Sequence, residues 1–153
     1  SPRVAFRDVT NSIDSRTVIS CLIPPNVFLI HTAPYLLLPK GSPNDSIFIL
    51  GILSSITLDW FARRFVSLHL TFFILNSLPI PFPDTDSILR NRIVELAGRL
   101  ACVDERFADW AEEIGLCLIE RYGTNRDLRS FPARRSSGRV TPDARCASLC
   151  KVR

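Results

Sequence analysis

The chain has 153 residues, of which 46% are apolar and 22% are charged, so its composition is globular and does not resemble a disordered chain. Its net charge of +4 is unevenly distributed: residues 1–115 carry ten basic and twelve acidic side chains, whereas residues 116–153 carry nine and three. The main body is therefore slightly acidic, and any contact it makes with a nucleic acid must depend on local basic clusters rather than on a bulk positive field.

Short β-strands are predicted for the first forty residues. Arg3–Thr10 alternates apolar and polar side chains, and Thr17–Ile23 is rich in β-branched residues. Between them, Asn11–Ser15 has the Asn, Asp and Ser side chains typical of a turn. Val27–Thr32 and Tyr35–Leu38 are two further apolar runs, which neighbouring prolines limit to short strands.

A buried helix is predicted from Ile47 to about Arg64, because both faces of this segment are apolar until Asp59. Leu68–Leu75 is predicted to be a strand, followed by a stiff connector made by the prolines of Pro79–Pro83. The apolar runs Ile47–Leu58 and Phe65–Ile74 are shorter than the roughly 20 residues needed to span a bilayer, so we expect no membrane contact.

One long amphipathic helix is predicted from about Ser87 to Ile114. Its apolar residues alternate between spacings of four and three, as in a heptad repeat: Leu89, Ile93, Leu96, Leu100, Val103, Phe107, Trp110 and Ile114. A single helix cannot bury such a stripe against itself. We therefore expect the second half, Val103–Ile114, to project and to dock on another protein body or on a second copy of the chain.

The composition changes after Gly115, and residues 116–153 are predicted to be a basic, disordered tail. Two origins remain open: an authentic tail, or a sequence altered by a shifted reading frame or a fusion. The chain opens at Ser1 and contains no Met, which we interpret as a fragment of a longer protein. The predicted organisation is a domain of residues 1–83, a heptad helix of residues 84–115 and the tail.

Six segments carry a family resemblance: Arg3–Asp8, Arg16–Ile19, Ile52–Ser55, Asp59–Arg64, Phe72–Pro81 and Arg92–Leu100. Over about residues 1–115, they resemble the C-terminal target-recognition region of adenine-specific DNA methyltransferases and type II restriction–modification enzymes, often called a TaqI-like specificity domain. The resemblance implies a module that binds double-stranded DNA in the cytoplasm beside the methyltransferase body of a parent enzyme. That parent would use S-adenosylmethionine and could also carry a nuclease.

Side chains suited to reading DNA gather at the first turn and at the end of the predicted buried helix. Arginine can bind guanine with two hydrogen bonds, asparagine can bind adenine, and threonine can bind phosphate. The alternative is a solvated strand edge with ordinary charge pairs. The predicted DNA contacts are Arg7, Asn11, Arg16, Thr17, Arg63 and Arg64.

The chain itself carries no recognisable catalytic motif. The Asn-Pro-Pro-aromatic loop of adenine methyltransferases has only Pro24-Pro25-Asn26 as its nearest counterpart, in the wrong order. A Gly-rich cofactor turn and a zinc-like cysteine spacing are missing too, so we expect no catalytic residue, cofactor or metal, and free cysteine thiols. Two other hypotheses remain: a structural or interaction module that works through the heptad helix without DNA, and a small Cys- or His-dependent enzyme.

The predicted class is therefore α+β: short β-strands with a buried helix, then a strand and a long amphipathic C-terminal helix.

Overall fold

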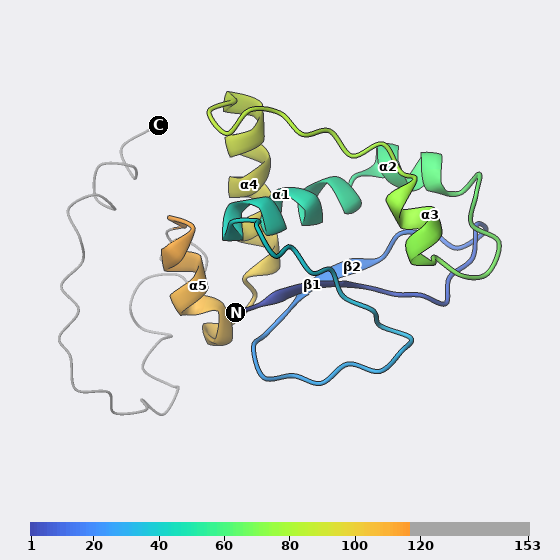
Figure 1. Cartoon of the computed structure of the whole chain (residues 1–153), viewed down its shortest axis with the longest axis horizontal. Helices are drawn as coiled ribbons and strands as arrows, with labels where there is room; N and C mark the ends of the chain where they lie inside the picture. The colour runs from blue at the N-terminus through green and yellow to red at the C-terminus, as the bar shows by residue number, and fades with distance from the viewer. Residues whose placement is uncertain (117–153) are drawn as a thin grey trace, which may run out of the picture. The chain divides into compact units, whose positions relative to one another are not determined.

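The computed structural model describes residues 1–116; the predicted tail and its cysteines lie outside the described residues, apart from Leu116. The described residues have a mixed α+β fold, with one two-stranded antiparallel sheet and five α-helices (Figure 1). The predicted α+β class is therefore confirmed, whereas several of the predicted elements differ.

The sheet consists of β1 (Arg3–Phe6) and β2 (Ser20–Ile23), paired so that Arg3 faces Ile23 and Phe6 faces Ser20. Both strands are shorter than the sequence pattern predicts. The strands expected at 27–32 and 35–38 are not formed. Instead, this loop runs along β1 through three hydrogen bonds: Phe6 N to Pro34 O at 3.0 Å, Asp8 N to Thr32 O at 3.0 Å and Leu36 N to Val4 O at 2.8 Å. Because prolines cannot donate to a ladder, the pairing stays irregular.

The predicted buried helix is divided into α1 (Pro43–Leu53) and α2 (Ile56–Ala62), which meet at a 65° bend. The bend follows from Ser55, whose backbone is extended and whose hydroxyl accepts a hydrogen bond from Leu58 N at 3.2 Å, so that it begins a new helix. In residues 1–116 no single helix is long and apolar enough to cross a membrane, and only the bent pair α1–α2 would pass such a test, by length and composition alone.

The strand predicted at 68–75 is wrong. Only its first residues are extended, where Leu70 N donates to Asp8 O at 2.8 Å and His69 bridges to Val9. Thr71 then caps the short helix α3 (Phe72–Asn76), accepting a hydrogen bond from Ile74 N at 3.5 Å. Alternation in a short apolar run cannot distinguish a strand from a helix, and here the Thr71 cap favours the helix.

The long helix predicted from 87 to 114 is also wrong, because it is interrupted. Helix α4 (Ile88–Ala101) ends at Cys102, whose ψ of 82° is not helical. Asp104 then accepts a hydrogen bond from Arg106 N at 2.9 Å and starts a 3₁₀ turn, η1 (Glu105–Phe107), that leads into α5 (Ala108–Glu113). A capping aspartate offers the backbone an alternative to a continuous helix.

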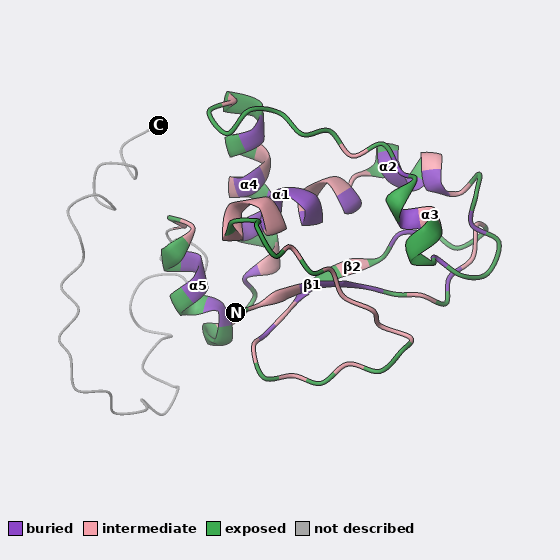
Figure 2. Cartoon of the chain, in the orientation of Figure 1, coloured by how far each residue is buried: buried purple, intermediate pink, exposed green. Residues whose placement is uncertain are grey.

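Helix α1 lies at the centre of the described part, between the hairpin and α4, which runs across it (Figures 1 and 2). Its apolar residues Ile47, Leu50 and Leu53 are buried, which fits its apolar sequence on both faces. At its start, the buried guanidinium of Arg90 on α4 pairs with the Asp45 carboxylate and lies over the Phe48 ring at 5.6 Å. Hydrogen bonding from Ser42 N, despite partial desolvation, lowers the pKa of Asp45.

Within the heptad stripe, the leucines of the first half and Val103 are exposed, whereas the two largest side chains of the second half are buried. In α4, Leu89 and Leu100 are exposed by 76% and 73%, whereas Phe107 and Trp110 are buried. The inward face of α4 uses small and branched residues instead: Val94, Ala97 and Gly98. The prediction that Val103–Ile114 forms an exposed docking surface is therefore wrong for its two largest side chains, Phe107 and Trp110.

The crossing of α1 and α4 depends on Gly51. A Cβ atom there would lie 2.7 Å from Ile93 Cγ2 and 3.1 Å from Ala97 Cβ. Ile93 is β-branched and has little freedom to turn away within a helix. The helices can therefore approach this closely only because position 51 has no side chain.

We expect Gly51→Ala to lower the free energy of unfolding by about 1–3 kcal/mol through overpacking, although alanine favours a helix by about 1 kcal/mol. Urea unfolding followed by circular dichroism measures the change. In an Ile93→Ala background the same substitution should cost less, because the closest clashing atom is gone. A stabilising effect of Gly51→Ala in the unmodified background would contradict this packing.

Candidate nucleic-acid interface

The loop between β1 and β2 is held to α2 by one buried carboxylate. Asp59 is 3% exposed, and its Oδ1 accepts hydrogen bonds from the backbone N–H groups of Thr17 and Val18, both at 2.8 Å. Its Oδ2 accepts from Arg63 Nε at 3.0 Å, and Arg16 Nε lies 3.4 Å from Oδ1. Three hydrogen-bond donors and the Arg16 guanidinium, from two segments of the chain, therefore converge on one side chain.

Arg63 extends this connection to the tip of the loop. Its Nη1 donates to Ser12 O at 3.2 Å and its Nη2 donates to Ser15 O at 2.6 Å, while its Nε binds Asp59. All three nitrogen atoms of the guanidinium group are thus engaged by the protein. Arg63 is a predicted DNA contact, but this geometry makes it a residue that positions the loop.

Inside the loop, two more predicted contacts are used for local structure. Asn11 Oδ1 accepts from Ile13 N at 3.1 Å, which forms the expected Asx-type turn, and Asn11 O accepts from Thr17 Oγ1 at 3.1 Å. Thr10 Oγ1 donates to Thr17 O at 2.7 Å. Thr17 is fully buried, so its hydroxyl cannot reach a phosphate in this conformation, and the prediction for Thr17 does not fit the structure.

Arg7 and Arg16 keep part of their guanidinium groups at the surface. Arg7 pairs with Asp14 at 3.0 Å, and both side chains are 45% exposed. Arg16 is 35% exposed and donates Nη2 to Ser54 O at 2.8 Å. Arg64 is not bound to this loop in the structure; its guanidinium lies 4.9 Å from the centre of the exposed Trp60 ring.

The cluster is close to electrically balanced. Three arginines, at positions 7, 16 and 63, face two carboxylates, at positions 14 and 59. Burial acts to raise the pKa of Asp59, but hydrogen bonds from Val18 N, Arg63 and Thr17 N, with the charge of Arg16, lower the pKa overall. Asp59 is therefore ionised at neutral pH and matches the arginines that surround it.

Asp59 is the central residue that the sequence pattern did not single out. It is the only charged residue between Ile47 and Phe61, and it lies four residues before Arg63. A lone carboxylate in an apolar helical run must find partners or remain protonated. This signal predicts a buried, paired Asp59, although it does not predict which loop supplies the partners.

Among residues 1–116, no three His, Cys, Asp or Glu side chains gather closely enough to hold a metal ion. His69 Nδ1 lies 3.1 Å from Asp8 Oδ2, an exposed pair near the hairpin. Burial raises the pKa of the Cys21 thiol, which disfavours the reactive thiolate. The described part thus offers hydrogen-bond donors and a fixed loop for binding.

No protein-family model, curated protein or solved structure matches this chain.

We expect Asp59→Asn to lower the free energy of unfolding by about 2–3 kcal/mol at neutral pH. We expect a free-energy cost at the low end of the range for breaking a buried ion pair, because Arg16 and Arg63 are partly exposed. The matched control is Asp14→Asn, which breaks the exposed pair with Arg7 and should cost less than about 1 kcal/mol. Chemical unfolding of both variants measures the difference.

The effect should also depend on pH. Because the pKa of folded Asp59 lies below its ordinary value of 3.8, its contribution is present above about pH 4 and is lost as the pH falls through the folded pKa. The stability gap between the unmodified chain and Asp59→Asn should therefore narrow in acid. Equal costs for the Asp59 and Asp14 variants at neutral pH would contradict a central role for Asp59.

Proposed function

We propose that this chain carries a DNA sequence-recognition module and is part of a site-specific adenine-N6 DNA methyltransferase or restriction–modification enzyme. The observation that supports it is the gathering of five predicted contacts around one loop: Arg7, Asn11, Arg16, Thr17 and Arg63. Arg63 and Ser12 are 51 residues apart in the sequence and yet are joined directly.

In this proposal, some residues of the cluster contact DNA, and the others hold the loop in the conformation that exposes those contacts. Arg7 and Arg16 contact base edges or phosphates, because their guanidinium groups remain partly exposed. Arg63 and Thr17 hold the loop through hydrogen bonds within the protein, and Asn11 uses its Oδ1 atom in the turn. A loop that is already ordered loses less conformational entropy on binding than a flexible one.

Transfer of the Arg7 guanidinium from Asp14 to DNA costs little free energy. A solvent-exposed ion pair contributes about 0–1 kcal/mol, so its loss is small compared with a bidentate contact to guanine, worth about 1–3 kcal/mol of discrimination. Asp14 also disfavours non-specific binding, because it competes for Arg7 wherever no suitable base is present. A near-neutral cluster in a slightly acidic body fits recognition of bases better than general adhesion to DNA.

The parent enzyme in this proposal acts in the cytoplasm and supplies the catalytic step. Its methyltransferase body would bind S-adenosylmethionine, whereas this chain contributes the contacts that choose the DNA site.

We expect Arg7→Ala to weaken site-specific binding by about 1–3 kcal/mol if it contacts a base. Arg16→Lys, which keeps the charge and removes the planar fork, should lose a similar amount. Selection from a random duplex library with the full chain would identify the site, and titration at several salt concentrations would measure affinity. Each lost phosphate contact reduces the salt slope by about 0.9.

The matched control is Arg64→Ala, because Arg64 lies outside the cluster and stacks on Trp60. It should leave the choice of sequence unchanged. Absence of salt-dependent duplex binding by the full chain, or unchanged selectivity in both the Arg7 and Arg16 variants, would overturn the proposal.

A second candidate function, a protein-interaction module, is favoured by the α4 stripe, which we define as Leu89, Leu96 and Leu100. These leucines are exposed by 76%, 46% and 73% and lie on one face of the helix. The salt-bridged row Arg92–Glu95–Arg99 runs beside them. This arrangement suits docking of an amphipathic helix, and in the proposed enzyme its occupant is the methyltransferase body. The two functions are compatible.

In the isolated chain, the α4 stripe should cause weak self-association. Leu96→Glu together with Leu100→Glu should shift the chain toward monomer in sedimentation equilibrium without lowering its melting temperature, because neither side chain belongs to the core. Asn91→Glu, at an exposed α4 position away from the stripe, is the control for added charge. Global unfolding of the double variant would show that the stripe is covered within the chain.

A further inference from the structure

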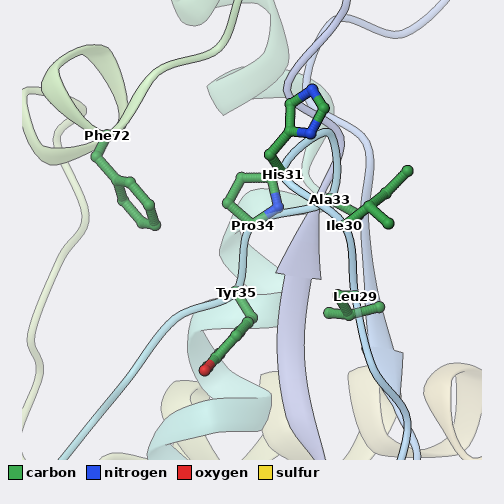
Figure 3. A pocket seen from close by; sticks show the side chains of 7 residues that line it. All are labelled: Leu29, Ile30, His31, Ala33, Pro34, Tyr35 and Phe72. Carbon is green, nitrogen blue, oxygen red and sulfur yellow. The ribbon is translucent and has the colours of Figure 1, made fainter.

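An aromatic hollow lies beside β1, on the loop that replaces the expected third and fourth strands (Figure 3). Its volume is about 240 Å³. The loop supplies most of the lining, and α3 supplies one ring. The lining residues are Leu29, Ile30, His31, Ala33, Pro34, Tyr35 and Phe72.

The rings of the hollow are held in place by the core. The Phe72 ring packs edge-on against the buried Phe6 ring, with centres 5.3 Å apart and planes at 90°, and 45% of Phe72 remains exposed. Tyr35 is bridged to Ala5 on β1, and the Arg3 guanidinium lies 4.5 Å from the centre of its ring. Figure 3 shows Phe72 pointing toward the loop that carries Pro34 and Tyr35.

The hollow also offers hydrogen-bonding groups. Within the described residues, neither the His31 ring nor the Tyr35 hydroxyl has a hydrogen-bond partner. A purely apolar occupant would leave both groups unused. A nucleobase combines a flat π-face for the rings with donors and acceptors on its edge for His31 and Tyr35.

The hollow is continuous with the candidate DNA-contact loop through the backbone. Thr32 accepts a hydrogen bond from Asp8 N, and Pro34 accepts one from Phe6 N, so the rim of the hollow lies directly against the residues that flank Arg7. A guanidinium donor and an aromatic surface on adjoining segments are the combination that proteins use to hold unpaired bases.

We propose that this aromatic hollow binds an unpaired nucleobase by stacking. The proposal rests on the proposed DNA-recognition function and adds that the module prefers DNA with a base displaced from its stack. The stacked base is held chiefly by Phe72 and Tyr35, and His31 contributes a hydrogen bond to its edge. Stacking accepts any base, so the hollow adds affinity for the displaced base, whereas the loop arginines read the sequence.

The test compares the full chain on two duplexes of equal length, one fully paired and one with a single unpaired fluorescent adenine analogue. We expect tighter binding of the second duplex, with quenching of the analogue on stacking. Phe72→Leu combined with His31→Ala keeps an apolar contact with Phe6 and should weaken binding to the bulged duplex by about 5- to 150-fold. Binding to the paired duplex should remain unchanged.

Two variants keep the test specific. Phe72→Tyr retains the π-face and should preserve the preference, whereas Phe73→Leu removes an 83% exposed ring on the same helix that does not line the hollow and should have no effect. Salt-dependent binding that is equal for both duplexes and insensitive to the hollow variants would overturn the stacking proposal alone and would favour a peptide side chain as the occupant. No binding to either duplex would overturn both proposals.

Discussion

The carboxylate of Asp59 connects the loop between β1 and β2 with helix α2. It accepts hydrogen bonds from the backbone after the first loop and from an arginine one turn further along its own helix, and it pairs with a second arginine within the loop. A buried charge is costly without such partners, so the loop conformation and the burial of Asp59 require one another. The same contacts that satisfy this charge also hold Arg16 at the surface.

Helix α1 provides the frame for this arrangement. It packs against the hairpin and against α4, and the absence of a side chain at Gly51 allows the second contact. Three surface features then remain available for function: the loop around Arg7 and Arg16, the aromatic hollow beside β1, and the α4 stripe. The loop and the hollow adjoin through backbone hydrogen bonds, which supports a shared ligand for these two.

The sequence predicts the fold class and the first turn because both depend on local chemistry. Asn11 and its neighbours form the expected turn, and the part of the apolar run that forms α1 is helical and largely buried, whereas Ile56 and Trp60 on α2 are exposed. The sequence does not predict the bend at Ser55, the cap at Thr71 or the end of α4 at Cys102. At Ser55 and Thr71, a single polar side chain competes with a hydrophobic pattern that continues on both sides of it. The heptad spacing also fails to indicate which face is covered, because small residues such as Ala97 and Gly98 allow closer packing than leucine. The candidate residues themselves come together, but their separation into contacting and positioning groups depends on Asp59, whose backbone N–H partners Thr17 and Val18 are more than forty residues away.

The backbone amide signals of the loop test the central claim most directly. In a nuclear magnetic resonance titration of the full chain with its selected duplex, the account predicts the largest chemical-shift changes at residues 11–17 and at the Nε–H groups of Arg7 and Arg16. The Nε–H of Arg63 should keep its hydrogen-bonded signal, because it remains bound to Asp59. Shifts confined to α4, with an unchanged loop, would contradict the account and identify the α4 stripe as the working surface.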